Sequence, residues 1–519
     1  MKRPLPTLSA CLIAACFTAA AAWADSAPPD VPMATLQNLP APPPGDAPSQ
    51  AGGSDFNLPQ IGEAGADVVT PQQEYSIGLQ VINELRDAGF IVGDPLLHEY
   101  IENLGRSLSS HSDNPELNFG FYIIDDPEIN ATTLPGGFIV VNSGLFLMTD
   151  SEDELAGVIA HEIGHVTQRH LARQLEDQKD RSFLDFATML AGILAATKTS
   201  DPDVAMGALA TAQGSIIQHQ INYTRGDEAE ADRVGIATLA RAGYQPEGLI
   251  DFFTKMESLS SLNGYDRIPS FLLDHPLDLT RIAEAKSRAE QLHVPPRPDS
   301  RDYVLMKARL KALQDDSTQS LQAYFEAGVS SSHGWDQAAK RYGLALVYGR
   351  EGRYADASTI MASLASEYDD VTAFRIGLAN NEMQAGKTAE AIRTYQAALR
   401  LFPDSKPLIL SYANDLIEAG RPKDATDLLA TLTTGRQADP EALRLSAKSY
   451  DKLDDSADSH YYMSEYYLAS GSPSDAVDQL RIALATPGLS SVQQQRYRAR
   501  LHRMEQAARQ AREDAENGP

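Results

Sequence analysis

Cysteine is almost absent from this chain, which has two among 519 residues, and both lie near its N-terminus. Cys11 and Cys16 belong to a mostly apolar run that follows two basic residues, and Ala22-Trp23-Ala24 has the small-x-small form of a signal peptidase site. We expect residues 1–24 to be a signal peptide, so the mature protein would have neither disulfide bonds nor thiol chemistry. An exported, cysteine-free protein of this size fits a bacterial periplasm. The alternative is a lipoprotein, because the residues before Cys16 loosely fit a lipidation box.

Long apolar runs and positive charge are also scarce. Beyond the N-terminal run, no segment reaches about 18 apolar residues without interruption, the length that a membrane-spanning helix needs. The chain has 44 Lys and Arg against 71 Asp and Glu, a formal net charge of −27. Nucleic acid and anionic lipid headgroups are therefore poor general partners, and any contact with a membrane would have to be apolar.

The segment after the leader, residues 25–66, is rich in Pro, Ala, Gly and Ser, a composition that predicts a disordered tether. From there to residue 292, short β-branched and aromatic stretches alternate with helical periodicity. We place strands at 118–126 and 136–145, a loop between them at 127–135, and long helices at 151–175 and 226–243. The fold class predicted for this domain is α+β, mostly α, with a small sheet.

Two mostly apolar helical stretches, 182–197 and 204–217, lie between the two long helices. Apolar helices usually belong to a core, so a buried helical hairpin is the favoured interpretation. The alternative is an exposed apolar surface that meets lipid or an unfolded client protein.

A period of 34 residues runs through the C-terminal part of the chain, where glycine and alanine recur together. The pairs are Gly352 with Ala357, Gly386 with Ala391, and Gly420 with Ala425, and Gly471 with Ala476 follows after one and a half periods. Small residues let paired helices approach, and glycine permits the tight turn between them. We therefore predict an all-α tetratricopeptide solenoid over residues 300–513, with a groove for extended peptide or protein segments.

An H-E-x-x-H motif, His161-Glu162-Ile163-Gly164-His165, lies within the helix predicted at 151–175. Residues four apart on a helix lie about 40° apart around its axis, so both imidazoles project from one face and can bind one Zn²⁺. Glu162 can point toward the same cleft and take a proton from a water molecule on the metal. His170 lies about 140° round a continuous helix from His165, which excludes it as a further ligand.

A catalytic zinc requires a third protein ligand. The metzincin pattern is excluded, because Gln168 and Leu171 stand where that pattern requires glycine and histidine. Glu228 and Asp232 are four residues apart on the helix predicted at 226–243, so they share a face. Glu228 can complete a His-His-Glu site, and Asp232 can accept a hydrogen bond from the outer nitrogen of a zinc histidine.

The succession of H-E-x-x-H and E-x-x-x-D resembles the membrane-protease-type gluzincins, the family of HtpX and the CAAX prenyl proteases. Supporting stretches are NATTLPGGFIVVNSGLF at Asn130–Phe146 and DHPLDLTRI at Asp274–Ile282. With the leader and the repeat array, the chain is most similar to the β-barrel assembly-enhancing protease family of the Gram-negative periplasm. The resemblance implies a zinc metallopeptidase domain at 67–292 that holds one Zn²⁺.

The resemblance also implies the roles of the site residues. The zinc ligands would be His161, His165 and Glu228, with Glu162 as the general base and Asp232 beside the ligands. In this family a histidine of a His-Pro motif can approach the zinc. Here that residue is His275, which would either stabilise the transition state or occupy the fourth metal position at rest.

The clients implied by the resemblance are unfolded or misassembled outer-membrane β-barrel proteins. The repeat array would bind clients or dock to the barrel-assembly machinery, and the apolar stretches would touch the inner face of the outer membrane. We also propose that the strand around Phe138–Val141 is an edge strand, to which an extended substrate adds by backbone pairing. A core strand fits the same pattern equally well.

Two other functions remain open at this point. A periplasmic chaperone or scaffold would act through its repeats, with a metal site that is gated or idle. A non-proteolytic zinc hydrolase is the weaker alternative, because a groove for extended peptides suits a protease. The Pro-rich linker at 292–300 predicts limited hinge freedom between the two domains.

Overall fold

The computed structural model describes residues 71–177, 223–263, 268–314, 317–434 and 438–516. The expected signal peptide, the tether and the two apolar stretches lie outside these residues. Among the helices that are described, none combines the length and apolar composition required to cross a membrane. The fold is mostly helical with one small sheet, which confirms the predicted fold class.

The sheet has three strands, β1 (Gly120–Ile124), β2 (Ala131–Leu134) and β3 (Phe138–Asn142), in the order β1-β3-β2. Strand β3 runs parallel to β1 and antiparallel to β2. Two predictions are therefore wrong: the expected loop at 127–135 contains β2, and the strand around Phe138–Val141 is central instead of lying at an edge. The β-branched Thr132 and Thr133 favour an extended backbone, but Asn and Pro at the ends of so short a segment also mark turns.

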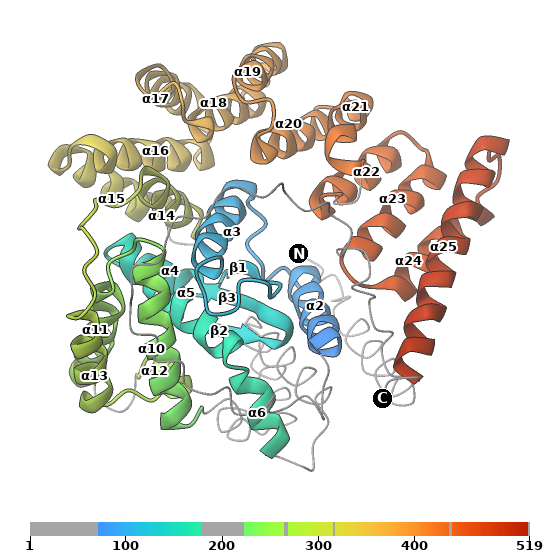
Figure 1. The fold of residues 1–519 in the computed structure, drawn as a ribbon. Helices are drawn as coiled ribbons and strands as arrows, with labels where there is room; N and C mark the ends of the chain where they lie inside the picture. Colours follow the sequence, from blue (N-terminus) through green and yellow to red (C-terminus); the bar gives the residue numbers. More distant parts are fainter. Residues whose placement is uncertain (1–70, 178–222, 264–267, 315–316, 435–437, 517–519) are drawn as a thin grey trace, which may run out of the picture.

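Helices pack against this sheet and supply the rest of the peptidase domain (Figure 1). They are α2 (Pro71–Asp87), α3 (Pro95–Ser109), α4 (Ser143–Met148), α5 (Glu152–Thr167), α6 (His170–Asp177), α10 (Arg225–Arg241), α11 (Glu247–Asn263), α12 (Ser270–Asp274) and α13 (Leu279–Ala289). The single helix predicted at 151–175 is thus two helices. The chain breaks before α6 at Arg169, whose φ of 53° lies in the left-handed region.

Helix α5 lies at the centre of the domain, and its residues from Leu155 to His165 are all buried. Ser151 begins the helix, since its side chain accepts a hydrogen bond from the backbone N–H of Glu154. Helices α3, α10 and α11 and strand β2 contact α5. The H-E-x-x-H motif is therefore part of a rigid core element, which suits residues that must hold fixed positions.

The C-terminal part consists of helices in antiparallel succession that form an arc (Figure 1). They are α14 (Arg301–Leu313), α15 (Thr318–Ser331), α16 (Gly334–Arg350), α17 (Tyr354–Glu367), α18 (Thr372–Gln384), α19 (Thr388–Leu401), α20 (Lys406–Glu418), α21 (Pro422–Thr433), α22 (Pro440–Lys452), α23 (Ser456–Ala469), α24 (Pro473–Ala485) and α25 (Ser491–Glu516). The repeat alanines are fully buried between them: Ala357, Ala391, Ala425 and Ala476.

The turns of the array require a left-handed residue. Gly352, Gly386 and Gly420 have φ of 75°, 75° and 72°. The next position of the 34-residue period holds Asp454, whose φ is 58°, in the turn between α22 and α23. Aspartate tolerates this conformation, so the period continues where the sequence shows no glycine. Gly471, which is half a period out of step with these positions, lies in the following turn, between α23 and α24.

The array curves around the peptidase domain, and α3 lies inside the arc (Figure 1). Helices α14 and α20 both contact α3. Farther along, Asn83 of α2 donates a hydrogen bond to the backbone oxygen of Ser470 at the end of α23. The array therefore touches the peptidase domain at widely separated points along its length.

The linker at 292–300 is tied to the peptidase domain. The Ser300 hydroxyl donates a hydrogen bond to Glu152 at 2.8 Å, and the guanidinium of Arg297 lies 3.7 Å from the ring centroid of Tyr244. These contacts oppose the hinge freedom that its Pro-rich composition predicted.

A buried ion pair joins the two domains. Asp94 begins α3 by accepting hydrogen bonds from the backbone N–H groups of Leu96 and Leu97, and it also accepts two from Arg309 of α14, at 2.8 and 2.5 Å. Arg309 donates another to the Tyr342 hydroxyl at 2.6 Å. Burial would raise the pKa of Asp94, but the Arg309 guanidinium and the backbone donors outweigh it and lower that pKa.

Replacing Arg309 with Met should destabilise the chain by about 3–5 kcal/mol, because the Asp94 carboxylate stays buried without its cation. The shift of the urea midpoint measures this loss. The control is Arg301→Met, which removes a surface pair with Asp370 that contributes at most about 1 kcal/mol. Since folding lowers the pKa of Asp94, the contribution of the pair should be complete near neutral pH and decrease in acid. Equal midpoint shifts for the two variants would contradict this role of the buried pair.

Candidate metal centre

The predicted ligands meet where α5 packs closely against α10. A Cβ atom on Gly164 would lie 2.9 Å from the backbone oxygen of Ala231, and one on Gly235 would lie 3.0 Å from the backbone nitrogen of His161. Any larger residue at these positions would push the helices apart. The two glycines thereby let side chains from facing turns of α5 and α10 reach one another.

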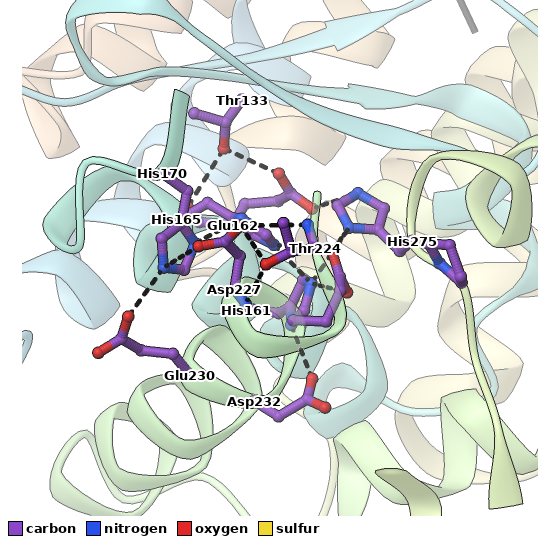
Figure 2. Close-up of polar contacts among 12 residues, drawn as sticks. Thr133, His161, Glu162, His165, His170, Thr224, Asp227, Glu230, Asp232 and His275 are labelled. Carbon is purple, nitrogen blue, oxygen red and sulfur yellow. Dashed lines mark hydrogen bonds and ion pairs between the residues drawn. The ribbon is translucent and has the colours of Figure 1, made fainter. Parts of the chain in front are cut away.

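His161, His165 and Glu228 form one buried cluster, and Figure 2 shows the two imidazoles close together. The Nε2 atoms of the two histidines are 3.0 Å apart, and the Glu228 carboxylate lies 3.5 Å from each, through different oxygens. Two ligand atoms about 2.05 Å from one tetrahedral ion would be about 3.3 Å apart. The three donors therefore have the spacing that a tetrahedral metal site requires.

His275, which follows α12, contributes a further nitrogen. Its Nδ1 atom lies 3.4 Å from Nε2 of His161 and 3.0 Å from an oxygen of Glu228. The donor atoms of all four residues lie within 4.8 Å of one another. Asp274, the preceding residue, accepts a hydrogen bond from Asn130 at 2.8 Å, which ties this segment to the start of β2.

The cluster holds buried negative charge. Glu162 and Glu228 are both 0% exposed, and Oε1 of Glu162 has no hydrogen-bond partner in the described part of the chain. Burial would lower the pKa of His275, but Glu228 and Glu162 outweigh it and raise that pKa to about 9. Burial and the neighbouring imidazoles lower the pKa of His165 well below its usual value, which keeps the ring neutral for metal binding. Buried carboxylates beside the neutral His165 imidazole suit a divalent cation.

Glu162 faces the cluster, with one carboxylate oxygen hydrogen-bonded to Thr133 and the other directed toward His275. Oε2 accepts a hydrogen bond from the Thr133 hydroxyl of β2 at 2.8 Å, and Oε1 lies 3.4 Å from Nε2 of His275 (Figure 2). Burial raises the pKa of Glu162, which makes its carboxylate a stronger base than an exposed one. Thr133 was not among the residues expected in the site, because its segment, 127–135, was predicted to be a loop.

Arg281 of α13 is a second residue that the sequence analysis missed. Its guanidinium donates two hydrogen bonds to Asp232, at 2.8 and 2.9 Å, and lies 2.7 Å from Glu228. Asp232 also lies 3.0 Å from Nδ1 of His161. Burial would raise the pKa of both carboxyls, but the cluster histidines and Arg281 outweigh it and lower both. The one sequence signal for Arg281 was its place in the stretch that begins at Asp274.

Two more buried side chains contact His165 without joining the donor cluster. The Nδ1 atoms of His170 and His165 are 2.9 Å apart (Figure 2). The Tyr223 ring packs on the His165 ring, with centroids 3.9 Å apart. Neither residue was expected in the site from the sequence, where His170 was excluded as a metal ligand.

Comparison with known proteins identifies the family of this chain. Residues 95–289 match peptidase family M48, and residues 382–449 match a tetratricopeptide repeat family. The chain is 33% identical to the β-barrel assembly-enhancing protease of Escherichia coli strain K12 over 462 residues, which is 89% of this chain and 93% of that protein. It is 32% identical to the putative β-barrel assembly-enhancing protease of Vibrio cholerae, over 88% of this chain and 94% of the relative.

A more distant relative is the mitochondrial metalloendopeptidase OMA1 of Bos taurus, at 28% identity over 44% of this chain and 43% of that protein. These matches confirm the resemblance that the motifs predicted. The chain therefore belongs to the M48 metallopeptidases, in the family of the β-barrel assembly-enhancing proteases, and is a metalloendopeptidase whose peptidase domain precedes a tetratricopeptide array.

Proposed function

We propose that this protein is a zinc endopeptidase in which His161, His165 and Glu228 hold one Zn²⁺ and Glu162 is the general base. The observation that carries the proposal is the 3.0–3.5 Å spacing of the three donors within a buried cluster. Two imidazole nitrogens and one carboxylate are a ligand set that catalytic zinc uses, with a fourth position left for water or substrate.

Zinc, when bound, supplies a Lewis acid that polarises a peptide carbonyl and makes water more acidic. The protein's own part is proton transfer by Glu162. Its free Oε1 faces the donor cluster, so it can take a proton from the attacking water and later deliver it to the leaving amine. Thr133 fixes the other oxygen, which keeps the carboxylate aimed in one direction. Asp232 orients the His161 ring through its outer nitrogen.

His275 is proposed to close the site at rest. Its Nδ1 atom has the ligand spacing to both His161 and Glu228, so it would fill the fourth position that water or substrate needs. The ring must withdraw before catalysis. Of the two roles that the resemblance implies for His275, we propose resting occupancy of the fourth position, and stabilisation of the transition state is the alternative.

We propose that an extended substrate pairs with β2. This strand is at the edge of the sheet, and its residue Thr133 contacts Glu162, so a chain added beside it would pass the proposed base. Backbone pairing does not depend on side chains, which suits an enzyme that selects clients by exposed extended chain. This role was expected of β3, which is central.

The names of the relatives, together with the N-terminal sequence, support a place in envelope protein quality control. We propose that residues 1–24 direct the protein to the periplasm of a Gram-negative bacterium. The peptidase domain, 67–292, would degrade misassembled outer-membrane β-barrel proteins. The array, 300–513, would bind clients or the barrel-assembly machinery, with peripheral contact to the outer membrane through the apolar stretches.

A second candidate function is supported by the closed donor cluster. With His275 in the fourth position, the protein would act at rest as a chaperone or scaffold that binds through its repeats. The two functions are distinguishable: rescue of a deletion strain by the Glu162→Gln protein would favour binding, and failure to rescue would favour proteolysis.

Replacing Glu162 with Gln should lower casein cleavage at least about 100-fold, because the amide cannot accept the proton of the attacking water. Zinc content, measured by atomic absorption, should stay at one per chain. Glu326→Gln, on the exposed face of α15, is the matched control and should leave cleavage unchanged. Cleavage by the Glu162→Gln protein at the wild-type rate would overturn the assignment of the base.

Replacing His275 with Ala should raise basal casein cleavage severalfold, because the fourth position is then open without a conformational change. Initial rates at saturating casein measure the effect. The double variant Glu162→Gln, His275→Ala is the control and should be inactive, which shows that the gain comes from the same site. Complete loss of activity in His275→Ala would mean that this residue is required for the reaction and is not a gate.

A further inference from the structure

We infer that His170 and Glu230 form a hydrogen-bond relay that sets the tautomer and the orientation of the His165 ring, so that His170 is a positioning residue for metal binding. The inference rests on the proposed metal centre. Three contacts carry it: His165 to His170, His170 to Glu230, and Glu230 to Arg173 (Figure 2 shows the first two).

A break in the helix makes this contact possible. In a continuous helix His170 would lie about 140° round the axis from His165 and point away from it. Instead α5 ends at Thr167, and the left-handed Arg169 redirects the chain into α6. His170 then turns back toward α5, and its ring becomes 1% exposed. Arg169 is held in this strained conformation by an ion pair with Glu74 of α2, at 2.6 Å.

The positions of the ring nitrogens determine which atom donates and which accepts at each hydrogen bond of the relay. Nε2 of His165 faces Nε2 of His161 and Glu228, so it is the atom available to a metal and its proton must be on Nδ1. That Nδ1–H can donate to Nδ1 of His170, 2.9 Å away. His170 then carries its own proton on Nε2, which lies 3.2 Å from a carboxylate oxygen of Glu230. Each ring thus has one tautomer compatible with its neighbours.

Glu230, the last residue of the relay, is fixed by an ion pair with Arg173. The guanidinium of Arg173 donates to the same oxygen of Glu230 at 2.9 Å and lies 3.4 Å from Asp227. Asp227 caps α10 together with Thr224, so its position is fixed by the helix start. The carboxylate that receives the His170 proton is therefore itself held in place.

Helix α10 serves both ligand histidines by this arrangement. Glu228 belongs to the donor cluster, and Asp232, one turn later, lies directly beside the outer nitrogen of His161. Glu230 serves His165, but only through the His170 ring as a spacer. A zinc histidine whose outer nitrogen lacks such a partner binds the metal about 10–100-fold more weakly.

The test separates the hydrogen bond from the packing of the ring. His170→Phe keeps a ring but loses the acceptor, and His170→Asn keeps an acceptor near the position of Nδ1 but loses volume. Zn²⁺ affinity of the full chain is measured by competition with a chromophoric chelator. Thermal denaturation in excess Zn²⁺ verifies that each variant folds. His111→Phe, at an exposed histidine of the same domain, is the control.

The relay predicts about 10–100-fold weaker zinc binding for His170→Phe, near wild-type binding for His170→Asn, and no change for His111→Phe. Wild-type affinity in His170→Phe would overturn it, and so would equal losses in His170→Phe and His170→Asn, which would indicate packing. If instead the wild-type chain itself bound no Zn²⁺, the proposed function would fail before the relay could be judged, so the two failures are distinguishable.

Discussion

Close packing of α5 against α10, through Gly164 and Gly235, sets the distance between the two halves of the candidate metal centre. One helix brings the histidine pair and Glu162, and the other brings Glu228 and Asp232. A separation larger by the width of one methyl group would carry the Glu228 carboxylate beyond the reach of both imidazoles. Strand β2, the segment after α12 and helix α13 add direct contacts to the same side chains, through Thr133, His275 and Arg281.

Charge balance is the second constraint, and two buried residues that follow α12, His275 and Arg281, contribute to it. Arg281 is fixed by three short contacts to Asp232 and Glu228, and it also donates to the backbone oxygen of Pro276 at 2.8 Å. The polar contacts of the His275 ring are to His161, Glu228 and Glu162, and the ring also packs on Phe271 and Tyr223. Arg281 thus holds the carboxylates of α10 through contacts that do not involve His275, as the proposed gating by His275 requires.

The sequence predicted the fold well wherever structure follows a regular period. The fold class and the stacked repeats are confirmed, since both depend on spacings of apolar and small residues. The wrong predictions lie in segments whose residues are compatible with two different backbone structures. The four-residue strand β2 is too short for alternation to appear, and its flanking Asn and Pro also mark turns. Asp454 replaced a repeat glycine, because the turn requires a left-handed backbone and not a particular residue.

The site residues likewise fall into two groups, those that a regular helix spacing reveals and those that it does not. The residues singled out from H-E-x-x-H and E-x-x-x-D stand one turn apart on regular helices, so their spacing alone puts them on common faces, and the structure brings them together. The residues that hold them do not share this geometry. His170 reaches His165 through a helix break, Thr133 comes from an edge strand, and Arg281 comes from a third helix. No spacing rule connects such residues, because the tertiary fold alone decides that they meet. The periodicity of a sequence can therefore identify candidate metal donors, but the network that orients them becomes visible only in three dimensions.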